Sequence, residues 1–348
     1  AEMRSYFRRL WYRPKITATL ISLFCTLNSG MIVLQTMIST HRKSHTLALL
    51  SALTFTVALF WLNNRHYLAF DLHGPDSAPF YQGMWNTLRG NIMFTTLNDD
   101  RSVLSYHFTP YFIFLSPLLL ILEDIRILFL VQIIGFALTG LLLYWFVWQN
   151  RPKIAPYFLL AFYLNPTLHQ IAYNELRRVT LAVPYIVLAL IALHLKKRWL
   201  MLIALLFALS CKENVSIFVF MVGIYIRVTE RDWRWGVPLS ALGLGWALLV
   251  PTLVIPALTP PDVPYGGLTE FAYLGETPSE IVLGVLRNPT QVLAYSFDSA
   301  ARDALWQFFL PLGIFLPLLA PRWFLIGVPS LALLLISGNA RLHQLEDW

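Results

Sequence analysis

Long apolar runs separated by short charged segments extend along most of the chain, and this pattern predicts membrane-spanning helices. A helix needs about 20 apolar residues to cross a bilayer core, and its backbone groups must be satisfied internally there. Several runs are shorter than that, so tilted or re-entrant helices are expected as well. The runs occupy 16–38, 46–62, 111–122, 126–148, 154–168, 180–195, 199–211, 215–226, 236–256, 304–320 and 322–338. We therefore expect an all-α integral membrane protein with about ten transmembrane or re-entrant helices.

Two long polar stretches interrupt this pattern. The first covers 63–110, and the second covers 257–303 and begins with several Pro and Gly residues. We interpret both as outer loops of one transmembrane domain over 46–348. A basic N-terminal segment with an apolar helix or hairpin, 1–45, precedes this domain.

Composition supports a membrane location. Hydrophobic residues make up 57% of the 348 residues, charged residues make up 13%, and the mean hydropathy is +0.59. Soluble domains carry about 25% charged residues, which is roughly twice as many. The net charge of +7 does not indicate nucleic acid, because the basic residues lie in short clusters between apolar runs. Such clusters are typical of cytoplasmic loops.

These basic clusters also predict an orientation. Arg151 with Lys153, the cluster at 196–198 and the cluster at 227–234 should mark cytoplasmic ends. The turns at 168–180 and 211–214 then face the extracytoplasmic side, together with the loop 63–110. The basic residues on both sides of the run 16–38 favour a hairpin there rather than a single span.

Asp71 and Asp76 lie at the start of the first polar stretch. A carboxylate at a membrane surface can act as a general base toward a hydroxyl group or hold a divalent cation. The alternative is that both are simply solvated loop residues. Together with His73 they are weak candidates for a metal site, because the spacing is not that of a compact ligand set.

The segment Glu175-Leu176-Arg177-Arg178 carries two arginines on the side opposite the basic clusters. Arg presents a planar fork that suits phosphate oxygens, so Arg177 and Arg178 are candidates for a lipid phosphate, with Glu175 beside them. A local Glu–Arg salt bridge is the equal alternative.

Lys212 and Glu213 form the most informative pair, because they separate two short apolar runs. Charges in membrane segments cost roughly 2.5–3.5 kcal/mol each, so they tend to be paired and functional. We expect Lys212 to hold a phosphate or pyrophosphate. The alternative is a structural ion pair between Lys212 and Glu213, whose side chains extend to the water–lipid interface.

His107, Glu175, Glu213 and Glu276 are candidates to line a cavity between the first outer loop and the Lys212 turn. Glu276 has a second interpretation, because Thr277 or Ser279 followed by Glu280 is typical of a helix N-terminus. We take helix capping as the default for this segment.

Taken together, these motifs resemble a family of bacterial polytopic membrane proteins known as a domain of unknown function. The resemblance runs from about 70 to the end of the chain. It is carried, in this order, by Phe70-Asp71-Leu72 with Asp76, Trp85-Asn86-Thr87, Gly90, His107-Phe108-Thr109-Pro110, Asn174-Glu175-Leu176-Arg177, Leu181-Ala182-Val183-Pro184, Cys211-Lys212-Glu213-Asn214 and Ala272-Tyr273-Leu274-Gly275-Glu276.

That family is in turn distantly similar to GT-C membrane glycosyltransferases, such as protein O-mannosyltransferases and aminoarabinose transferases. The similarity implies a GT-C-like fold, a polyprenyl-phosphate-linked sugar as donor, and an acceptor on the outer face. It further implies Asp71 as the base and Lys212 as the residue beside the lipid phosphate. The chain departs from the GT-C pattern because Asp71 and Asp76 are not adjacent, and because His107-Phe108-Thr109-Pro110 replaces a His-Pro-Pro element.

Three functions follow as hypotheses. The first is a glycosyltransferase of the bacterial inner membrane with its site facing the extracytoplasmic side, in which Asp71 and Asp76 are catalytic. The second is a non-catalytic subunit or scaffold that assembles with other membrane subunits. The third is a transporter, disfavoured because no pair of Gly- or Pro-broken segments occurs in equivalent halves. The expected partners are membrane lipids, the lipid-linked sugar and an acceptor, without nucleic acid. A divalent cation would be compatible, although no motif indicates one.

Overall fold

The structure is a computed structural model, and it describes residues 43–72, 76–97, 100–259, 270–310 and 319–338. The predicted hairpin at 16–38 lies outside these residues. Contacts divide the chain into two units, Ala1–Ser51 and Ala52–Trp348. In the first unit, the described residues form only the start of the helix Lys43–Leu68. All other elements described below belong to the second unit.

Three described helices are long and apolar enough to cross a membrane. They are Lys43–Leu68, α5 (Arg126–Asn150) and the continuous helix Trp233–Leu258. The third consists of α11 (Trp233–Leu249), a π-helical turn (Val250–Val254) and α12 (Ile255–Leu258). The π turn contains Pro251, which has no N–H to donate, so the hydrogen-bond ladder shifts its register there.

Five shorter apolar helices accompany them. Tyr111–Leu120 combines α4 (Tyr111–Leu115) with a 3₁₀ turn, and Arg178–His194 combines a 3₁₀ turn with α8 (Val183–His194). The others are α9 (Arg198–Cys211), α10 (Val215–Thr229) and α17 (Pro321–Leu335). A predominantly helical fold with helices able to cross a membrane is thus confirmed, while the expected count of about ten spans and the GT-C-like fold stay predictions.

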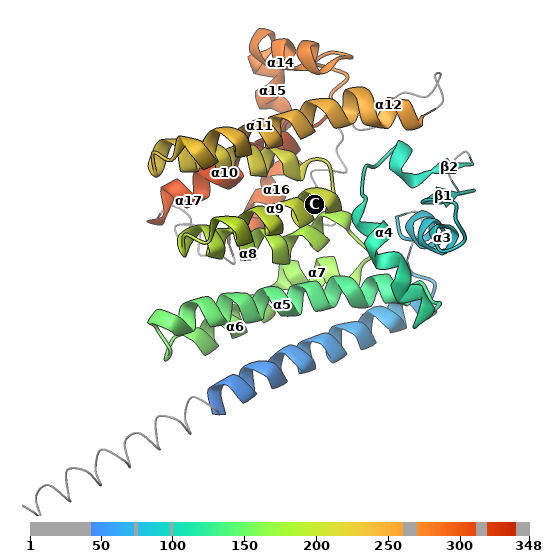
Figure 1. The fold of residues 1–348 in the computed structure, drawn as a ribbon, viewed down its shortest axis with the longest axis vertical. Coiled ribbons are helices and arrows are strands. Elements are labelled where there is room, and N and C mark those ends of the chain that lie inside the picture. Colours follow the sequence, from blue (N-terminus) through green and yellow to red (C-terminus); the bar gives the residue numbers. More distant parts are fainter. Residues whose placement is uncertain (1–42, 73–75, 98–99, 260–269, 311–318, 339–348) are drawn as a thin grey trace, which may run out of the picture. The chain divides into compact units, whose positions relative to one another are not determined.

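The helices pair as hairpins. Helix α8 packs against α9, α10 against α11, and α5 against both α8 and α6 (Ala155–Tyr163), and these helices run side by side in Figure 1. Helices α10 and α11 approach each other closely because glycines of each helix face the backbone of the other. A Cβ at Gly223 would meet Ser240, and one at Gly243 would meet the backbone of Phe220.

The apolar run expected at 154–168 forms two helices. Helix α6 (Ala155–Tyr163) ends before Asn165, and α7 (Pro166–Tyr173) begins after it. The side chain of Asn165 accepts a hydrogen bond from the Thr167 N–H, and Pro166 occupies the first helical position. This combination is a strong N-terminal signal, so the interpretation of one continuous run was wrong.

The first polar stretch is largely structured. The helix Lys43–Leu68 continues into it, followed by α3 (Ala78–Thr87), the antiparallel pair β1 (Phe94–Thr95) and β2 (Arg101–Ser102), and α4. Helix α3 is held by the core, because Phe80 and Met84 are buried together with Phe112 of α4. In Figure 1 this group lies beside the ends of α5 and α9.

The described part of the late polar stretch is also helical. It forms α14 (Pro278–Arg287), α15 (Pro289–Ser296) and α16 (Ser299–Phe309). Thr277 and Glu280 form a reciprocal capping box on α14, which confirms the capping interpretation. Asp298 caps α16 by a single hydrogen bond, which its side chain accepts from the Ala301 N–H. Helix α16 also covers the start of the apolar run expected at 304–320, most of whose remainder lies outside the described residues.

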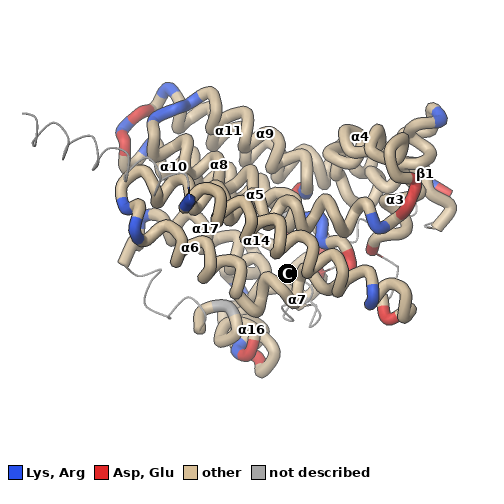
Figure 2. Tube along the Cα trace, turned by 90° about the horizontal axis from the view of Figure 1, so that it is seen from below, with Lys and Arg blue, Asp and Glu red and all other residues tan. Residues whose placement is uncertain are grey.

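Figure 2 shows Lys, Arg, Asp and Glu at both ends of the helix bundle, and the basic connections between the helices lie at one of these ends. Glu230, after α10, forms ion pairs with Lys196 and Arg198 between α8 and α9. The ring of His194, at the end of α8, lies 5.2 Å from that of Phe146 near the end of α5. The three basic connections therefore share one end of the helix bundle, as the sequence predicts for a common membrane face.

Candidate functional site

A cluster of charged side chains lies at the other end of these helices, around the turn between α9 and α10. Helix α9 ends at Cys211, and α10 begins at Val215. The N–H of Val215 donates to the Lys212 carbonyl at 3.2 Å, and Ser216 Oγ donates to the Glu213 carbonyl at 2.7 Å. These bonds fix the turn, so Lys212 and Glu213 are presented by a rigid hairpin rather than by a mobile loop.

Lys212 is the central cation of the cluster. Its ammonium group makes no hydrogen bond or ion pair with any side chain in the part of the chain that the structure describes. Burial lowers its pKa from 10.5, and the nearby charge of Arg178 lowers it further. The carboxylates of Glu213, Glu270 and Asp76 oppose this shift, so all of them are near enough to act on Lys212 electrostatically.

His107 faces the same turn from the segment before α4. Its Nδ1 lies 3.2 Å from Oε1 of Glu213. Burial lowers the pKa of His107 to about 4. Burial raises the pKa of Glu213, but the His107 hydrogen bond and the charge of Lys212 outweigh it and hold this pKa at about 2. At neutral pH Glu213 is therefore ionised and accepts, so Nδ1 of the neutral imidazole carries the proton and Nε2 keeps its lone pair.

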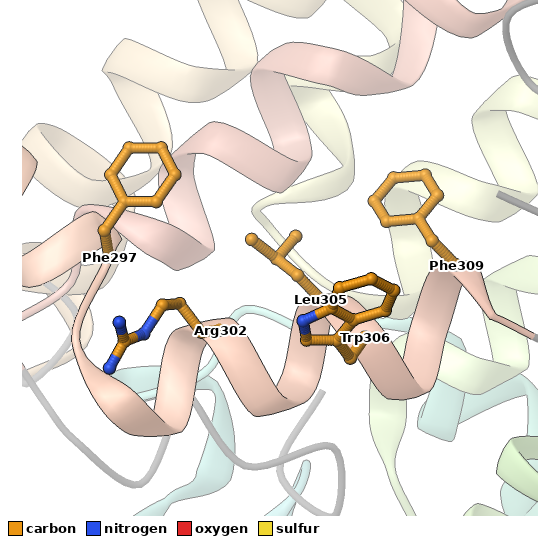
Figure 3. A pocket seen from close by; sticks show the side chains of 5 residues that line it. All are labelled: Phe297, Arg302, Leu305, Trp306 and Phe309. Carbon is orange, nitrogen blue, oxygen red and sulfur yellow. The ribbon is translucent and has the colours of Figure 1, made fainter. Parts of the chain in front are cut away.

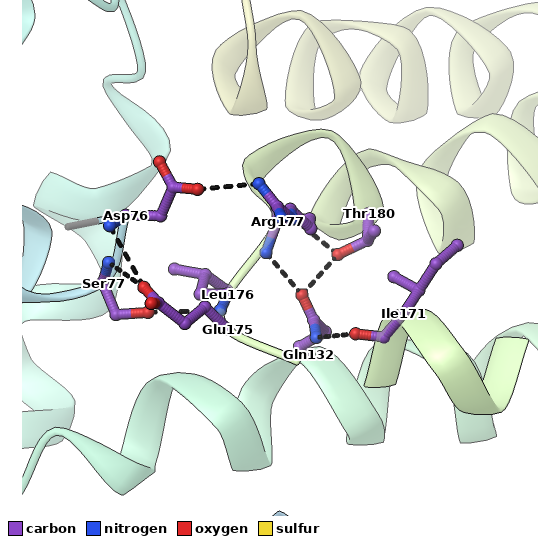
Figure 4. A network of polar contacts seen from close by, with 8 residues as sticks. All are labelled: Asp76, Ser77, Gln132, Ile171, Glu175, Leu176, Arg177 and Thr180. Atoms are coloured by element: carbon purple, nitrogen blue, oxygen red, sulfur yellow. Dashed lines mark hydrogen bonds and ion pairs between the residues drawn. The ribbon is translucent and has the colours of Figure 1, made fainter. Parts of the chain in front are cut away.

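Arg177 joins two parts of the chain. Its Nη1 donates to Oδ2 of Asp76 at 2.7 Å, and its backbone N–H donates to Oε1 of Gln132 on α5 at the same distance (Figure 4). The same Gln132 oxygen accepts from Thr180 Oγ1 at 2.8 Å. Asp76 is thus held next to the connection between α7 and α8, which is where the two arginines lie.

Glu175 is largely buried, and its carboxylate holds the N-terminus of α3 in place through two hydrogen bonds. Its Oε2 accepts from the backbone N–H groups of Asp76 and Ser77, both at 3.1 Å (Figure 4). In return, Ser77 Oγ accepts from the Leu176 N–H at 3.2 Å. A carboxylate at the N-terminus of a helix also opposes the positive end of the helix dipole. This role is structural: Glu175 positions Asp76.

Arg178 is the second cation without a direct anionic partner. Its guanidinium lies 5.0 Å from the centre of the Phe80 ring, a cation–π contact. Within the described residues it forms no hydrogen bond or ion pair, although its charge acts on both Lys212 and His107. Arg178 and Lys212 are therefore two neighbouring cations with unused hydrogen-bond donors, surrounded by carboxylates that are mostly engaged elsewhere.

Two residues expected in the site, Asp71 and Glu276, are exposed and make their described contacts with neighbouring residues. Asp71 is 63% exposed, and its Oδ2 is 3.8 Å from Nε2 of His66. Glu276 is exposed, and its N–H donates to the carboxylate of Glu280 in the capping box. His73 falls outside the described residues. Within the described residues, no group of three His, Cys, Asp or Glu side chains is placed to hold a metal.

Glu270 takes the place in the late segment that Glu276 was expected to have. Burial raises the pKa of Glu270, and the charge of Lys212 opposes the rise. Its sequence surroundings gave no signal, because it follows a Pro- and Gly-rich stretch that resembles any solvated loop. Only the folded chain brings it near Lys212.

A separate shallow pocket of about 250 Å³ occurs on α15 and α16 (Figure 3). It is lined by Phe297, Arg302, Leu305, Trp306 and Phe309. None of these residues belongs to the charged cluster, and the lining is almost entirely apolar. We do not assign it to the site.

The fold defines the class of the protein. Two of the three long apolar helices, Lys43–Leu68 and Trp233–Leu258, leave most of their residues unburied, and α11 exposes Val237, Leu244 and Leu248. Apolar surface on this scale is typical of an integral membrane protein. The chain belongs to the family described as "Predicted membrane protein (DUF2079)", whose family model matches residues 65–345. No curated protein and no solved structure matches the chain.

Proposed function

We propose that the chain is a membrane glycosyltransferase. It moves a sugar from a polyprenyl-phosphate-linked donor to a hydroxyl group of an acceptor at the extracytoplasmic face of the bacterial inner membrane. One observation carries the proposal: Lys212 and Arg178 lie within electrostatic reach of each other and of Asp76, and neither forms an ion pair among the described residues. Two such cations are suited to a phosphate group that is brought by a lipid.

In the proposed reaction, the acceptor oxygen attacks the anomeric carbon of the sugar. The bond from that carbon to the phosphate oxygen breaks, and its electron pair leaves with the polyprenyl phosphate. Lys212 and Arg178 stabilise the negative charge that develops on this leaving group. The proton of the acceptor hydroxyl passes to a carboxylate, which acts as general base.

The geometry favours Asp76 over Asp71 as that base. Asp76 is held by Arg177 and by the Glu175 carboxylate, and its charge acts on Lys212. Asp71 is exposed and makes contact only with His66 among the ion pairs of the described residues. Arg177 and Glu175 then serve as positioning residues. His107 and Glu213 line the site, and the hydrogen bond between them fixes the imidazole.

The test uses the purified full chain in nanodiscs with a panel of undecaprenyl-phosphate-linked hexoses and aminopentoses, and a cell-envelope fraction as acceptor. Release of undecaprenyl phosphate is measured. Loss of a general base typically costs about 10²–10⁴-fold, so Asp76→Asn should lose roughly that much of the rate. Asp71→Asn and the exposed loop variant Asp100→Asn should keep the wild-type rate.

Full activity of a folded Asp76→Asn protein would remove Asp76 from the mechanism. If wild-type protein releases nothing from any donor and binds no polyprenyl phosphate, the glycosyltransferase proposal fails. The non-catalytic subunit or scaffold is then the better account of the chain.

A further inference from the structure

A second cavity lies at the opposite end of the helices from the charged cluster, between α5, α8 and α17. Its volume is about 360 Å³, within the range of about 300–1,000 Å³ typical of ligand pockets. The lining is almost wholly apolar and consists of Leu143, Phe146, Val187, Leu190, Ile191, His194 and Trp323. An apolar cavity between apolar helices is suited to a hydrocarbon chain rather than to a polar solute.

Aromatic rings form one end of this cavity. The ring of His194 lies 5.2 Å from that of Phe146 and 6.3 Å from that of Trp323. Trp323 in turn packs at 5.1 Å against Tyr225 of α10. Trp and His are typical of the level where hydrocarbon meets head groups, so this end of the cavity corresponds to a water–lipid interface.

Cations adjoin the same end. Arg322 directly precedes Trp323 and is exposed, and Lys197 follows shortly after His194 and is also exposed. The Lys197 N–H donates to the Ala192 carbonyl at 2.8 Å, which keeps this residue at the C-terminal turn of α8. Neither side chain forms an ion pair within the described residues, whereas neighbouring Lys196 is paired with Glu230.

The wider surroundings are positive too. The connections 196–198 and 227–234 together contain six Lys and Arg residues against two acidic residues. Basic pockets between membrane helices are suited to anionic lipid head groups. A neutral lipid would use the cavity but would leave these cations without a counter-charge.

We propose that this cavity binds one acyl chain of an anionic glycerophospholipid, whose phosphate lies against Arg322 and Lys197. The site is independent of the proposed transfer reaction, because none of its residues belongs to the charged cluster around Lys212. It would fix the ends of α5, α8 and α17 to one another through a bound lipid.

Native mass spectrometry of the full chain in detergent tests this, with phosphatidylglycerol and phosphatidylcholine of the same acyl chains as the added probes. Wild-type protein should bind phosphatidylglycerol in preference. Arg322→Gln should weaken phosphatidylglycerol binding about fivefold, the effect of one cation near a head group, without changing phosphatidylcholine binding. Arg287→Gln, an exposed arginine on α14, is the matched control and should change neither.

Val187→Phe and Leu190→Phe each fill the cavity from α8. Either variant that remains monodisperse should lose the bound phosphatidylglycerol. Equal binding of the two lipids by wild-type protein would overturn the anionic head group, and so would unchanged selectivity in Arg322→Gln. Retention of the lipid by a monodisperse cavity-filling variant would overturn the cavity as its site.

Discussion

Arg177 Nη1 lies 2.7 Å from Asp76 Oδ2, and this ion pair joins the start of α3 to the connection between α7 and α8. The two residues are about a hundred positions apart in sequence, so the pair also closes the first polar stretch onto the helix hairpin. Because Arg177 forms this ion pair with Asp76, Arg178 and Lys212 are the cations of the cluster that lack an ion pair among the residues that the structure describes.

The pair His107–Glu213 predicts a pH dependence of stability. The pKa of His107 is lowered from 6.5 to about 4. Between these values the unfolded chain binds more protons than the folded one, so the stability that neutral His107 contributes is lost as the pH falls from 6.5 toward 4. The loss should be on the order of 1 kcal/mol between pH 6.5 and 5.

Glu213 adds a second loss at lower pH. Its pKa is lowered from 4.5 to about 2, so its contribution is present above pH 4.5 and falls away below it. Denaturant unfolding at pH 6.5 and pH 5, for wild-type protein and His107→Gln, separates the two. The free energy of unfolding of His107→Gln should change little between pH 6.5 and pH 5. An equal loss in both proteins would contradict the assignment to His107.

Asn63 should be a strong determinant of stability. Its Nδ2 donates to the carbonyls of Ala172, Tyr173 and Asn174 at 3.0–3.1 Å, and the side chain is fully buried. Asn63→Ala leaves the end of α7 without these donors and should cost about 1–3 kcal/mol. Asn63→Asp should cost more, because it turns a carboxylate toward three carbonyl oxygens.

Thermal unfolding in detergent measures this effect. Asn91→Ala, at an exposed position of the first polar stretch, is the control and should unfold like the wild type. Wild-type stability of Asn63→Ala would show that the end of α7 is held in another way.

The close α10–α11 contact predicts opposite effects at two glycines on one helix. A Cβ at Gly243 would meet the backbone of Phe220, whereas nothing lies within 4 Å of a Cβ at Gly245. Gly243→Ala should destabilise the protein by about 1–3 kcal/mol through overpacking. Gly245→Ala should be neutral or stabilising by up to about 1 kcal/mol, because it removes backbone freedom from the unfolded chain. Equal effects of the two substitutions on unfolding would contradict the packing of α10 on α11.

Glu175 is predicted to affect the rate by positioning Asp76, without touching the substrate itself. Glu175→Ala removes the acceptor of the Asp76 and Ser77 N–H groups, so Asp76 should lose its fixed place and the rate of transfer should fall about tenfold or more. Glu175→Gln keeps an acceptor oxygen and should recover most of that rate. The two variants are compared by release of undecaprenyl phosphate, and failure of the glutamine variant to recover it would argue against a role in positioning.

Much of the membrane architecture could be predicted from the sequence, because continuous apolar runs and basic clusters report directly on the bilayer. The α9–α10 turn with Lys212 and Glu213 is one example, since charges between two apolar runs stand out. The break at Asn165-Pro166 was also readable as a cap followed by Pro, but the apolar residues on both sides concealed it. Hydropathy alone does not distinguish one tilted helix from two short ones.

The partners within the site could not be predicted, because they depend on contacts between distant segments. Nothing in the spacing of Asp71 and Asp76 indicates that Arg177 pairs with the second and leaves the first exposed. Glu270 and Glu276 likewise look alike in sequence, yet the charge of Glu270 acts on Lys212, whereas Glu276 is exposed and donates its N–H to the capping box. Long-range electrostatics of this kind are a property of the folded chain.

The central claim is that Lys212 and Arg178 bind the phosphate of a polyprenyl lipid, and equilibrium binding to the purified chain tests it most directly. Undecaprenyl phosphate is compared with undecaprenol, which has the same chain without the phosphate, for wild-type protein, Lys212→Met, Arg178→Met and the exposed control Lys153→Met. The account predicts that wild-type and Lys153→Met proteins prefer the phosphorylated lipid. Lys212→Met and Arg178→Met should each reduce that preference about tenfold or more, because each removes one charge-assisted contact to the phosphate. Equal binding of both lipids by the wild type, or an unchanged preference in folded Lys212→Met and Arg178→Met proteins, would contradict it.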